Sequence, residues 1–210
     1  GLGGGSSNAG SVLLALNAHR NLRLSKRRLW EIASAVGADV PFFLFGGRAI
    51  GMGRGDILFP QEDGEKQYLV LNCPGVSLST ARIFSDLTEF GEMSRIYALF
   101  INGEGKRFVN RLEEPAFRIH PRLREEKAKM AEKSDGLVLM TGSGSTLFAL
   151  FSDISSARGF ASSDPKLKIV ETLGRREYYS QIGASPSGKA SDFGSDIRRF
   201  ESSRPSEENP

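Results

Sequence analysis

The stretch that decides the fold is Gly1-Leu2-Gly3-Gly4-Gly5-Ser6-Ser7-Asn8-Ala9-Gly10, which leads directly into the apolar run Val12-Leu13-Leu14-Ala15-Leu16. Several glycines immediately before a helical pattern indicate a sharply bent backbone that another group approaches closely. The segment Ser6-Ser7-Asn8 offers good N-cap residues, and the first amides of a helix have no carbonyl partner within that helix. The stretch therefore predicts an anion site, with phosphate as the usual anion, at the start of a helix over residues 8–20.

Two better-known glycine patterns do not fit this stretch. A Walker loop requires G-x-x-x-x-G-K-[ST], and no lysine follows these glycines. A dinucleotide loop requires G-x-G-x-x-[GA], and the sixth place counted from Gly1 is Ser6. A glycine-rich hinge without a ligand stays open as the alternative.

The composition is that of a globular protein with one or two domains: 210 residues, 39% of them hydrophobic and 25% charged. The net charge of +3 is small and the basic residues are mixed with acidic ones, so we expect no nucleic-acid partner. A single cysteine, Cys73, with two separated histidines excludes an internal disulfide and a zinc cluster and favours the cytoplasm. No apolar run of about 18 residues predicts a membrane span.

Hydrophobic spacing and turn residues predict an alternation of helices and strands. The first helix is expected to be largely buried, Ser25 to cap the second, and Gly37 to end it. The stretch 88–108 has no strong pattern. We expect strands at residues 48–51, 57–59, 68–71, 137–140, 146–151 and 167–172, and helices at residues 8–20, 26–36, 81–87, 110–117, 121–133 and 154–160.

A carboxylate stands directly after the second helix, in Gly37-Ala38-Asp39-Val40-Pro41-Phe42-Phe43. The large apolar residues that follow place Asp39 at the edge of a core, where a carboxylate without a partner is costly. Two interpretations stay open: Asp39 caps a turn, or it takes part in catalysis.

A second glycine-rich turn, Thr141-Gly142-Ser143-Gly144-Ser145, joins two apolar strands. Gly142 and Gly144 permit unusual backbone angles, and the turn exposes amides and hydroxyls. It is either an ordinary hairpin turn or a second cradle for an anion.

From about Arg175 the chain becomes polar and serine-rich, so the sequence predicts disorder there. Arg198–Ser202 and Ala184–Ala190 can be encoded by DNA that resembles the arms of a transfer RNA, and we hypothesise a tail read through from a neighbouring gene. Because Gly1 is not Met and stands inside the best motif, the chain is expected to be truncated at its N-terminus.

Three of these segments, Gly1–Ala9, Gly37–Phe43 and Gly142–Ala149, resemble the GHMP kinases in their order and spacing. The triple glycine and the Asp-Val-Pro-Phe-Phe run resemble most specifically the members that act on 4-diphosphocytidyl-2-C-methyl-D-erythritol. The resemblance covers roughly residues 1–172.

This resemblance implies an α+β fold of two domains. Residues 1–66 would form the remainder of an ATP-binding N-terminal domain of the ribosomal protein S5 domain 2-like type. Residues 67–174 would form a ferredoxin-like C-terminal domain, and residues 175–210 the disordered tail.

The implied reaction is transfer of the ATP γ-phosphate, with Mg²⁺, to the 2-hydroxyl of a small-molecule substrate, cytidyl-diphosphate methylerythritol, in non-mevalonate isoprenoid biosynthesis. Asp39 would receive or orient the proton of the attacking hydroxyl and contact the substrate. Thr80 is a second candidate for substrate contact. The Ser7 hydroxyl would reach the metal. The nucleotide-binding residues would be Gly1, Leu2, Gly3, Gly4, Gly5, Ser6, Ser7, Asn8, Gly142, Ser143 and Gly144.

This chain departs from the family pattern at its start. Family members carry a strand ahead of the glycine loop, with a lysine that pairs with the catalytic aspartate, and this segment is not in the sequence. The resemblance therefore implies a weakly active or inactive chain with exposed apolar surface. A GHMP kinase for another small alcohol and an inactive remnant of a disrupted gene stay open as alternatives, and the oligomeric state is undetermined.

Overall fold

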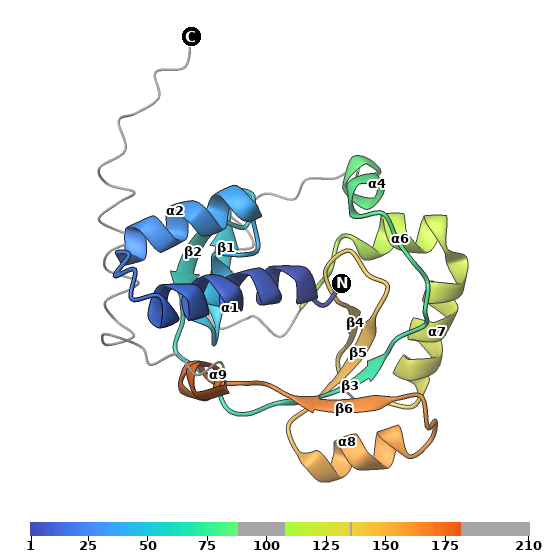
Figure 1. The fold of residues 1–210 in the computed structure, drawn as a ribbon. Coiled ribbons are helices and arrows are strands. Elements are labelled where there is room, and N and C mark those ends of the chain that lie inside the picture. The colour runs from blue at the N-terminus through green and yellow to red at the C-terminus, as the bar shows by residue number, and fades with distance from the viewer. Residues whose placement is uncertain (88–107, 135, 182–210) are drawn as a thin grey trace. The chain divides into compact units, whose positions relative to one another are not determined.

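The computed structural model describes residues 1–87, 108–134 and 136–181 (Figure 1). These residues form two compact units. Unit 1 consists of Gly1–Leu2 and Gln67–Thr172, and unit 2 of Gly3–Lys66 and the chain from Leu173 onward. The stretch 88–107 and the tail from residue 182 lie outside the described residues, so the expectations made for them stay predictions.

Unit 2 packs helices against a two-stranded hairpin. Its elements are α1 (Gly4–His19), α2 (Lys26–Val36), α3 (Phe42–Phe45), β1 (Ala49–Met52), β2 (Ile57–Pro60) and α9 (Arg175–Gln181). The strands are antiparallel, with Ala49 opposite Pro60. The Ser25 hydroxyl accepts a hydrogen bond from the Arg28 amide at 3.2 Å, which confirms the predicted cap of α2. The buried core comprises Leu29, Ala33, Val40, Leu44, Phe45 and Leu58.

Helix α1 begins at Gly4, earlier than predicted. Gly3 precedes it in the left-handed region at φ 64°, and no side chain of the described residues caps the helix. Ser6, Ser7 and Asn8 are therefore helical residues and not the predicted caps. The expectation of a largely buried helix is also wrong, because Gly10 alone is buried. The helix packs one apolar stripe against the unit 2 core, while Val12 and Leu16 on its other side are 56% and 47% exposed.

Helix α9 corrects the prediction of disorder from residue 175. The segment is polar, but two of its tyrosines find partners in α3: the hydroxyls of Tyr178 and Tyr179 donate to the carbonyls of Phe43 and Leu44, both at 2.6 Å. The polar composition of this segment suggested that it buries too little apolar surface to fold. Tyr179, however, is only 5% exposed.

Unit 1 is a four-stranded antiparallel sheet with helices. Its elements are β3 (Tyr68–Asn72), α4 (Thr80–Ser85), α6 (Glu113–Ile119), α7 (Pro121–Glu132), β4 (Val138–Met140), β5 (Leu147–Phe151), α8 (Ile154–Ala161) and β6 (Lys168–Glu171). The strand order is β4-β5-β3-β6. In the register of the sheet, Val70 of β3 lies opposite Ala149 of β5 on one side and opposite Ile169 of β6 on the other. This order and the β-α-β-β-α-β succession confirm the predicted ferredoxin-like fold.

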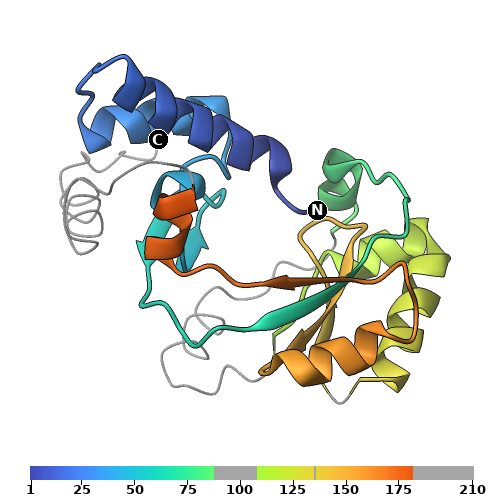
Figure 2. The same ribbon diagram turned by 60° about the horizontal axis from the view of Figure 1, so that its bottom comes forward.

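The core of unit 1 lies between the sheet and helices α7 and α8. Strand residues Val70, Met140 and Leu147 join helix residues Leu123 and Phe160 in one buried cluster. Both helices therefore cover the same face of the sheet, as Figures 1 and 2 show. The hairpin of β4 and β5 projects the glycine-rich turn 141–145 beyond the end of the sheet.

Candidate active site

The glycine stretch presents backbone amides at the start of α1. The first amide paired within the helix is that of Ser7, which donates to the Gly3 carbonyl at 2.8 Å. The amides of Gly4, Gly5 and Ser6 precede it, and the first turn contains no acidic residue. A helix of 16 residues thus begins with an uncompensated positive dipole end.

Gly4 and Gly5 have no structural need to be glycine. A Cβ atom added at either would meet no atom within 4 Å, and neither residue has a positive φ. Glycine in a helix costs roughly 0.5–1 kcal/mol relative to alanine, so these residues weaken α1 without serving its packing. Gly10 differs, because an added Cβ would come within 2.7 Å of the Phe43 Cβ atom. The open backbone at Gly4 and Gly5 is therefore accessible to a group from outside the helix.

Asp39 lies in the turn between α2 and α3 and is exposed. The argument that its carboxylate needs a partner in order to be tolerated is thus wrong, because solvent reaches it. Among the described residues, no hydrogen bond or ion pair holds this carboxylate, so the turn cap, one of the two interpretations left open, is not formed. The turn between β1 and β2 lies close by, since a Cβ atom on Gly55 would stand 3.8 Å from Oδ1 of Asp39.

Phe43 links the Asp39 segment to the glycine stretch within unit 2. Its ring lies 3.2 Å from the position of a Cβ atom on Gly3, and its backbone packs on Gly10. Val40 and Leu44, on either side of the bend into α3, are buried in the core of the same unit. Asp39 is therefore held on a rigid turn whose next helix rests against α1.

The second glycine-rich turn adopts the backbone angles that its sequence predicts. Gly142 has φ 47° and Gly144 φ 84°, both in the region that favours glycine. Gly1 packs on this turn within unit 1: the Thr141 hydroxyl donates to the Gly1 carbonyl at 2.6 Å. A Cβ atom on Gly1 would come within 2.5 Å of the Gly144 oxygen.

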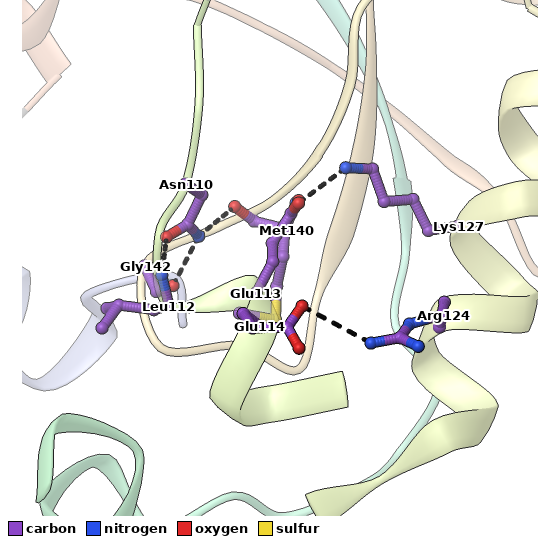
Figure 3. A network of polar contacts seen from close by, with 8 residues as sticks. All are labelled: Asn110, Leu112, Glu113, Glu114, Arg124, Lys127, Met140 and Gly142. Carbon is purple, nitrogen blue, oxygen red and sulfur yellow. Dashed lines mark hydrogen bonds and ion pairs between the residues drawn. The ribbon is translucent and has the colours of Figure 1, made fainter. Parts of the chain in front are cut away.

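Asn110 holds this turn through its side-chain amide (Figure 3). Its side-chain amide donates to the carbonyls of Met140 and Gly142, at 2.7 Å each. Its Oδ1 atom accepts from the Leu112 amide at 2.9 Å. One side chain thereby ties the start of α6 to both sides of the point where β4 becomes the turn.

Glu113 fixes β4 beside Asn110 (Figure 3). One carboxylate oxygen accepts from the Met140 amide at 2.8 Å, and the other pairs with Nζ of Lys127 at 2.6 Å. The side chains of Glu113 and Lys127 are only 13% and 25% exposed. The charged sequence of the helix predicted at residues 121–133 gave no sign that Lys127 would face Glu113.

Thr80 meets the turn through Ser143, since their hydroxyl oxygens lie 2.9 Å apart. Thr80 is the first residue of α4, and the Ser79 hydroxyl accepts from the Arg82 amide at 3.4 Å. The structure thus brings Thr80, Gly1 and Gly142–Gly144 together in unit 1. It places Gly3–Asn8 and Asp39 in unit 2, with Leu2 exposed in unit 1 and Asn8 exposed on α1.

Within the described ranges, no group of three or more His, Cys, Asp or Glu residues is arranged to hold a metal ion. No helix in the described part of the chain has both the length and the apolar character needed to cross a membrane.

Both units match models of one protein family. Residues 1–47 match the GHMP kinases N terminal domain, and residues 80–163 match the GHMP kinases C terminal domain. This chain belongs to the GHMP kinases. The N-terminal match contains the glycine stretch and Asp39, and the C-terminal match contains Thr80 and the turn 141–145.

Several similar proteins carry the name of one particular GHMP kinase. A 4-diphosphocytidyl-2-C-methyl-D-erythritol kinase from Solibacter usitatus is 37% identical over 73% of this chain and 52% of its own length. The kinase of the same name from Hahella chejuensis is 40% identical over 79% of this chain and 55% of its own length. This GHMP kinase chain thus spans about half the length of the curated relatives it matches.

Solved structures agree with this placement. The crystal structure of a 4-(cytidine 5'-diphospho)-2C-methyl-D-erythritol kinase matches with a TM-score of 0.66 and 34% identity, over 81% of this chain and 64% of the other. A homoserine kinase from Cytophaga hutchinsonii matches with a TM-score of 0.57 and 16% identity, over 78% of this chain and 62% of the other, which is a likeness of fold alone.

Proposed function

We propose that this GHMP kinase chain carries the nucleotide and acceptor sites of an ATP-dependent kinase that phosphorylates the 2-hydroxyl of 4-diphosphocytidyl-2-C-methyl-D-erythritol. The observation that carries the proposal is the open backbone at Gly4 and Gly5, where glycine serves neither packing nor backbone geometry. Similarity to kinases of that name supports the choice of acceptor.

The amides of Gly4, Gly5 and Ser6 would bind the phosphates of ATP. They precede the first amide paired within α1, and side chains at positions 4 and 5 would obstruct a phosphate lying against the backbone. Phosphoryl transfer is catalysed mainly by positioning and charge stabilisation, which fixed amides at a helix start can supply.

The turn Gly142–Gly144 of unit 1 would also bind the nucleotide. Asn110 and Glu113 hold the backbone around it in one arrangement, so its amides and the Ser143 hydroxyl are fixed before a ligand arrives. Thr80 would contact the substrate from the same place, because its hydroxyl touches that of Ser143.

Asp39 would receive or orient the proton of the attacking hydroxyl. Its carboxylate is exposed and, among the described residues, held by no ion pair, which leaves it available to an acceptor. Base catalysis of this kind contributes about 10²–10⁴-fold in rate.

Magnesium would neutralise charge on the phosphates during transfer. Because Mg²⁺ is usually bound by one or two protein groups with substrate phosphates, the lack of an acidic cluster in the described residues fits a metal that arrives with ATP. The Ser7 hydroxyl, on the first turns of α1, would supply one ligand.

The test uses the 210-residue chain and three measurements. ATP binding is followed by calorimetry, and phosphoryl transfer by a single-turnover assay with radiolabelled ATP. The acceptors are 4-diphosphocytidyl-2-C-methyl-D-erythritol and homoserine. Asp39→Asn should lower transfer by about 10²–10⁴-fold while ATP affinity stays unchanged. Asp164→Asn is the matched control, since its side-chain oxygen can still accept from the Lys166 amide.

Each result decides a different part of the proposal. Transfer to the cytidyl acceptor that disappears in Asp39→Asn supports all of it. Transfer to homoserine instead overturns the acceptor, and absent ATP binding overturns the nucleotide site. Binding without transfer refutes the acceptor site for this chain.

A further inference from the structure

The turn between β1 and β2 lies beside Asp39 within unit 2. A Cβ atom on Gly55 would stand 3.8 Å from Oδ1 of Asp39. Gly53 and Gly55 have φ 63° and 96°, in the region that favours glycine, and the Gly55 amide donates to the Met52 carbonyl at 2.9 Å. The backbone of the turn is therefore fixed by its own hydrogen bond, next to the carboxylate that would meet the acceptor hydroxyl.

Arg54 directly precedes Gly55 and presents a cation at this turn. Its side chain is 74% exposed, and its Nη2 atom pairs with Oδ2 of Asp56 at 3.0 Å. The side chain of Asp56 is only 16% exposed, so a shielded carboxylate holds a guanidinium that is open to solvent. A guanidinium has five N–H donors in a fork that matches two oxygens of a phosphate. The hydrogen bond to Asp56 therefore leaves donors available for an anionic ligand.

Chain connectivity limits how far Arg54 can lie from Asp39. Consecutive Cα atoms are about 3.8 Å apart and a carbon–carbon bond spans about 1.5 Å, so the Arg54 Cα atom lies within about 9 Å of Oδ1 of Asp39. The long arginine side chain can thus reach a ligand group that lies a few bonds away from a hydroxyl bound at Asp39.

The proposed acceptor carries an anionic group at such a separation. In 4-diphosphocytidyl-2-C-methyl-D-erythritol, carbons 3 and 4 and one ester oxygen lie between the carbon of the 2-hydroxyl and the first phosphorus atom. When the hydroxyl meets Asp39, the diphosphate must therefore lie near the carboxylates of Asp39 and Asp56. Because like charges repel, the diphosphate needs a cation beside it, and Arg54 can supply that cation from the same turn.

We propose that Arg54 binds the diphosphate of the acceptor, and so selects an alcohol that carries a diphosphate over one that does not, such as homoserine. This inference rests on the proposed function, since the acceptor and the role of Asp39 are assigned there. The ion pair with Asp56 restricts the arginine side chain before the ligand arrives, which lowers the entropic cost of binding.

Calorimetric binding to three variants of the 210-residue chain tests the inference without requiring turnover. Arg54→Gln should weaken binding of the cytidyl acceptor about tenfold or more, because hydrogen bonds to charged groups are lost. Arg54→Lys keeps the charge but not the fork, so it should lose about threefold. Arg28→Gln is the matched control and should bind like the parent, since Arg28 is also exposed and paired with a carboxylate, that of Glu31, but lies in the first turn of α2.

Further ligands identify the part of the acceptor that Arg54 contacts. Cytidine diphosphate, which lacks the alcohol, should lose affinity for Arg54→Gln by a similar factor. 2-C-methyl-D-erythritol, which lacks the phosphates, and ATP should each bind Arg54→Gln as they bind the parent.

The outcomes separate this inference from the proposed function. Equal acceptor affinity in the parent and Arg54→Gln overturns the inference alone. A loss confined to ATP, or an equal loss in Arg28→Gln, also overturns it, because Arg54 would then serve the phosphate donor or act only through the net charge. A parent chain that binds ATP but not the acceptor refutes the proposed acceptor site, and the inference with it.

Discussion

The hydroxyl oxygens of Thr80 and Ser143 lie 2.9 Å apart, although 63 positions separate the two residues. The contact joins the start of α4 to the second glycine-rich turn within unit 1. A residue predicted for the substrate and a residue predicted for the nucleotide thus share one hydrogen bond, which makes their effects on binding interdependent.

Thr80→Val and Ser143→Ala should therefore be non-additive in ATP binding. Each removes one partner of the same hydrogen bond, so each is expected to weaken binding several-fold, and the double variant little further. A double-mutant cycle from calorimetric Kd values measures the coupling. Strict additivity of the two changes would show that the hydroxyls act separately.

Alanine at Gly4 or Gly5 should stabilise the fold and impair ATP binding. Each change lowers the cost of glycine in α1, by about 0.5–1 kcal/mol, because an added Cβ meets no atom within 4 Å. The same methyl group would stand where a phosphate approaches the backbone. Urea unfolding and calorimetry on the same samples separate the two effects.

Gly159→Ala is the matched control for these variants. Gly159 lies within α8 of unit 1, and an added Cβ there also meets nothing within 4 Å. It should gain similar stability with an unchanged Kd for ATP. Equal Kd values in all three variants would mean that no phosphate contacts the start of α1.

Removal of the Glu113 charge should destabilise unit 1 far more than removal of the Glu114 charge. Glu113→Gln can still accept from the Met140 amide, but it leaves the largely buried Lys127 ammonium without its counter-ion, at a cost of about 1–3 kcal/mol. Glu114 pairs with Arg124 at 3.5 Å with both side chains mostly exposed, so Glu114→Gln should cost under about 1 kcal/mol. Unfolding free energies of the two variants check this order, and equal losses would contradict it.

Alkaline pH should destabilise unit 2 through Tyr179. Burial raises the pKa of Tyr179 from 10.0 to about 12, and burial also raises the pKa of Tyr178. Because the folded pKa lies above the unfolded value, the contribution to stability is complete below pH 10 and is lost as the pH rises towards about 12. The unfolding free energy of the parent chain should fall more steeply over this window than that of Tyr179→Phe. Parallel pH profiles would exclude the effect.

Local sequence signals predicted most of the individual elements. The Ser25 cap, Gly37 after α2 and the alternation around the turn 141–145 are short-range features, and each appears close to its expected position. The helix start at Gly4 was missed because glycine propensity opposes a helix there. Gly10 packs against Phe43, and this contact joins segments that local patterns treat separately.

Long-range polar contacts escaped prediction for the same reason. The tyrosines of α9 looked like part of a disordered tail, and their partners are carbonyls in α3. Lys127 lies on the charged helix α7, yet it faces Glu113 across the junction with α6. Side-chain identity alone does not reveal such a partner, because backbone carbonyls are present at every position.

The division of unit 2 into Gly3–Lys66 and a piece that begins at Leu173 has a consequence for biosynthesis. During translation the ribosome must complete the whole intervening unit before Tyr178 and Tyr179 emerge from the exit tunnel. Until then the nascent N-terminal part lacks the partners of the Phe43 and Leu44 carbonyls, and premature termination before residue 178 would leave it permanently without them.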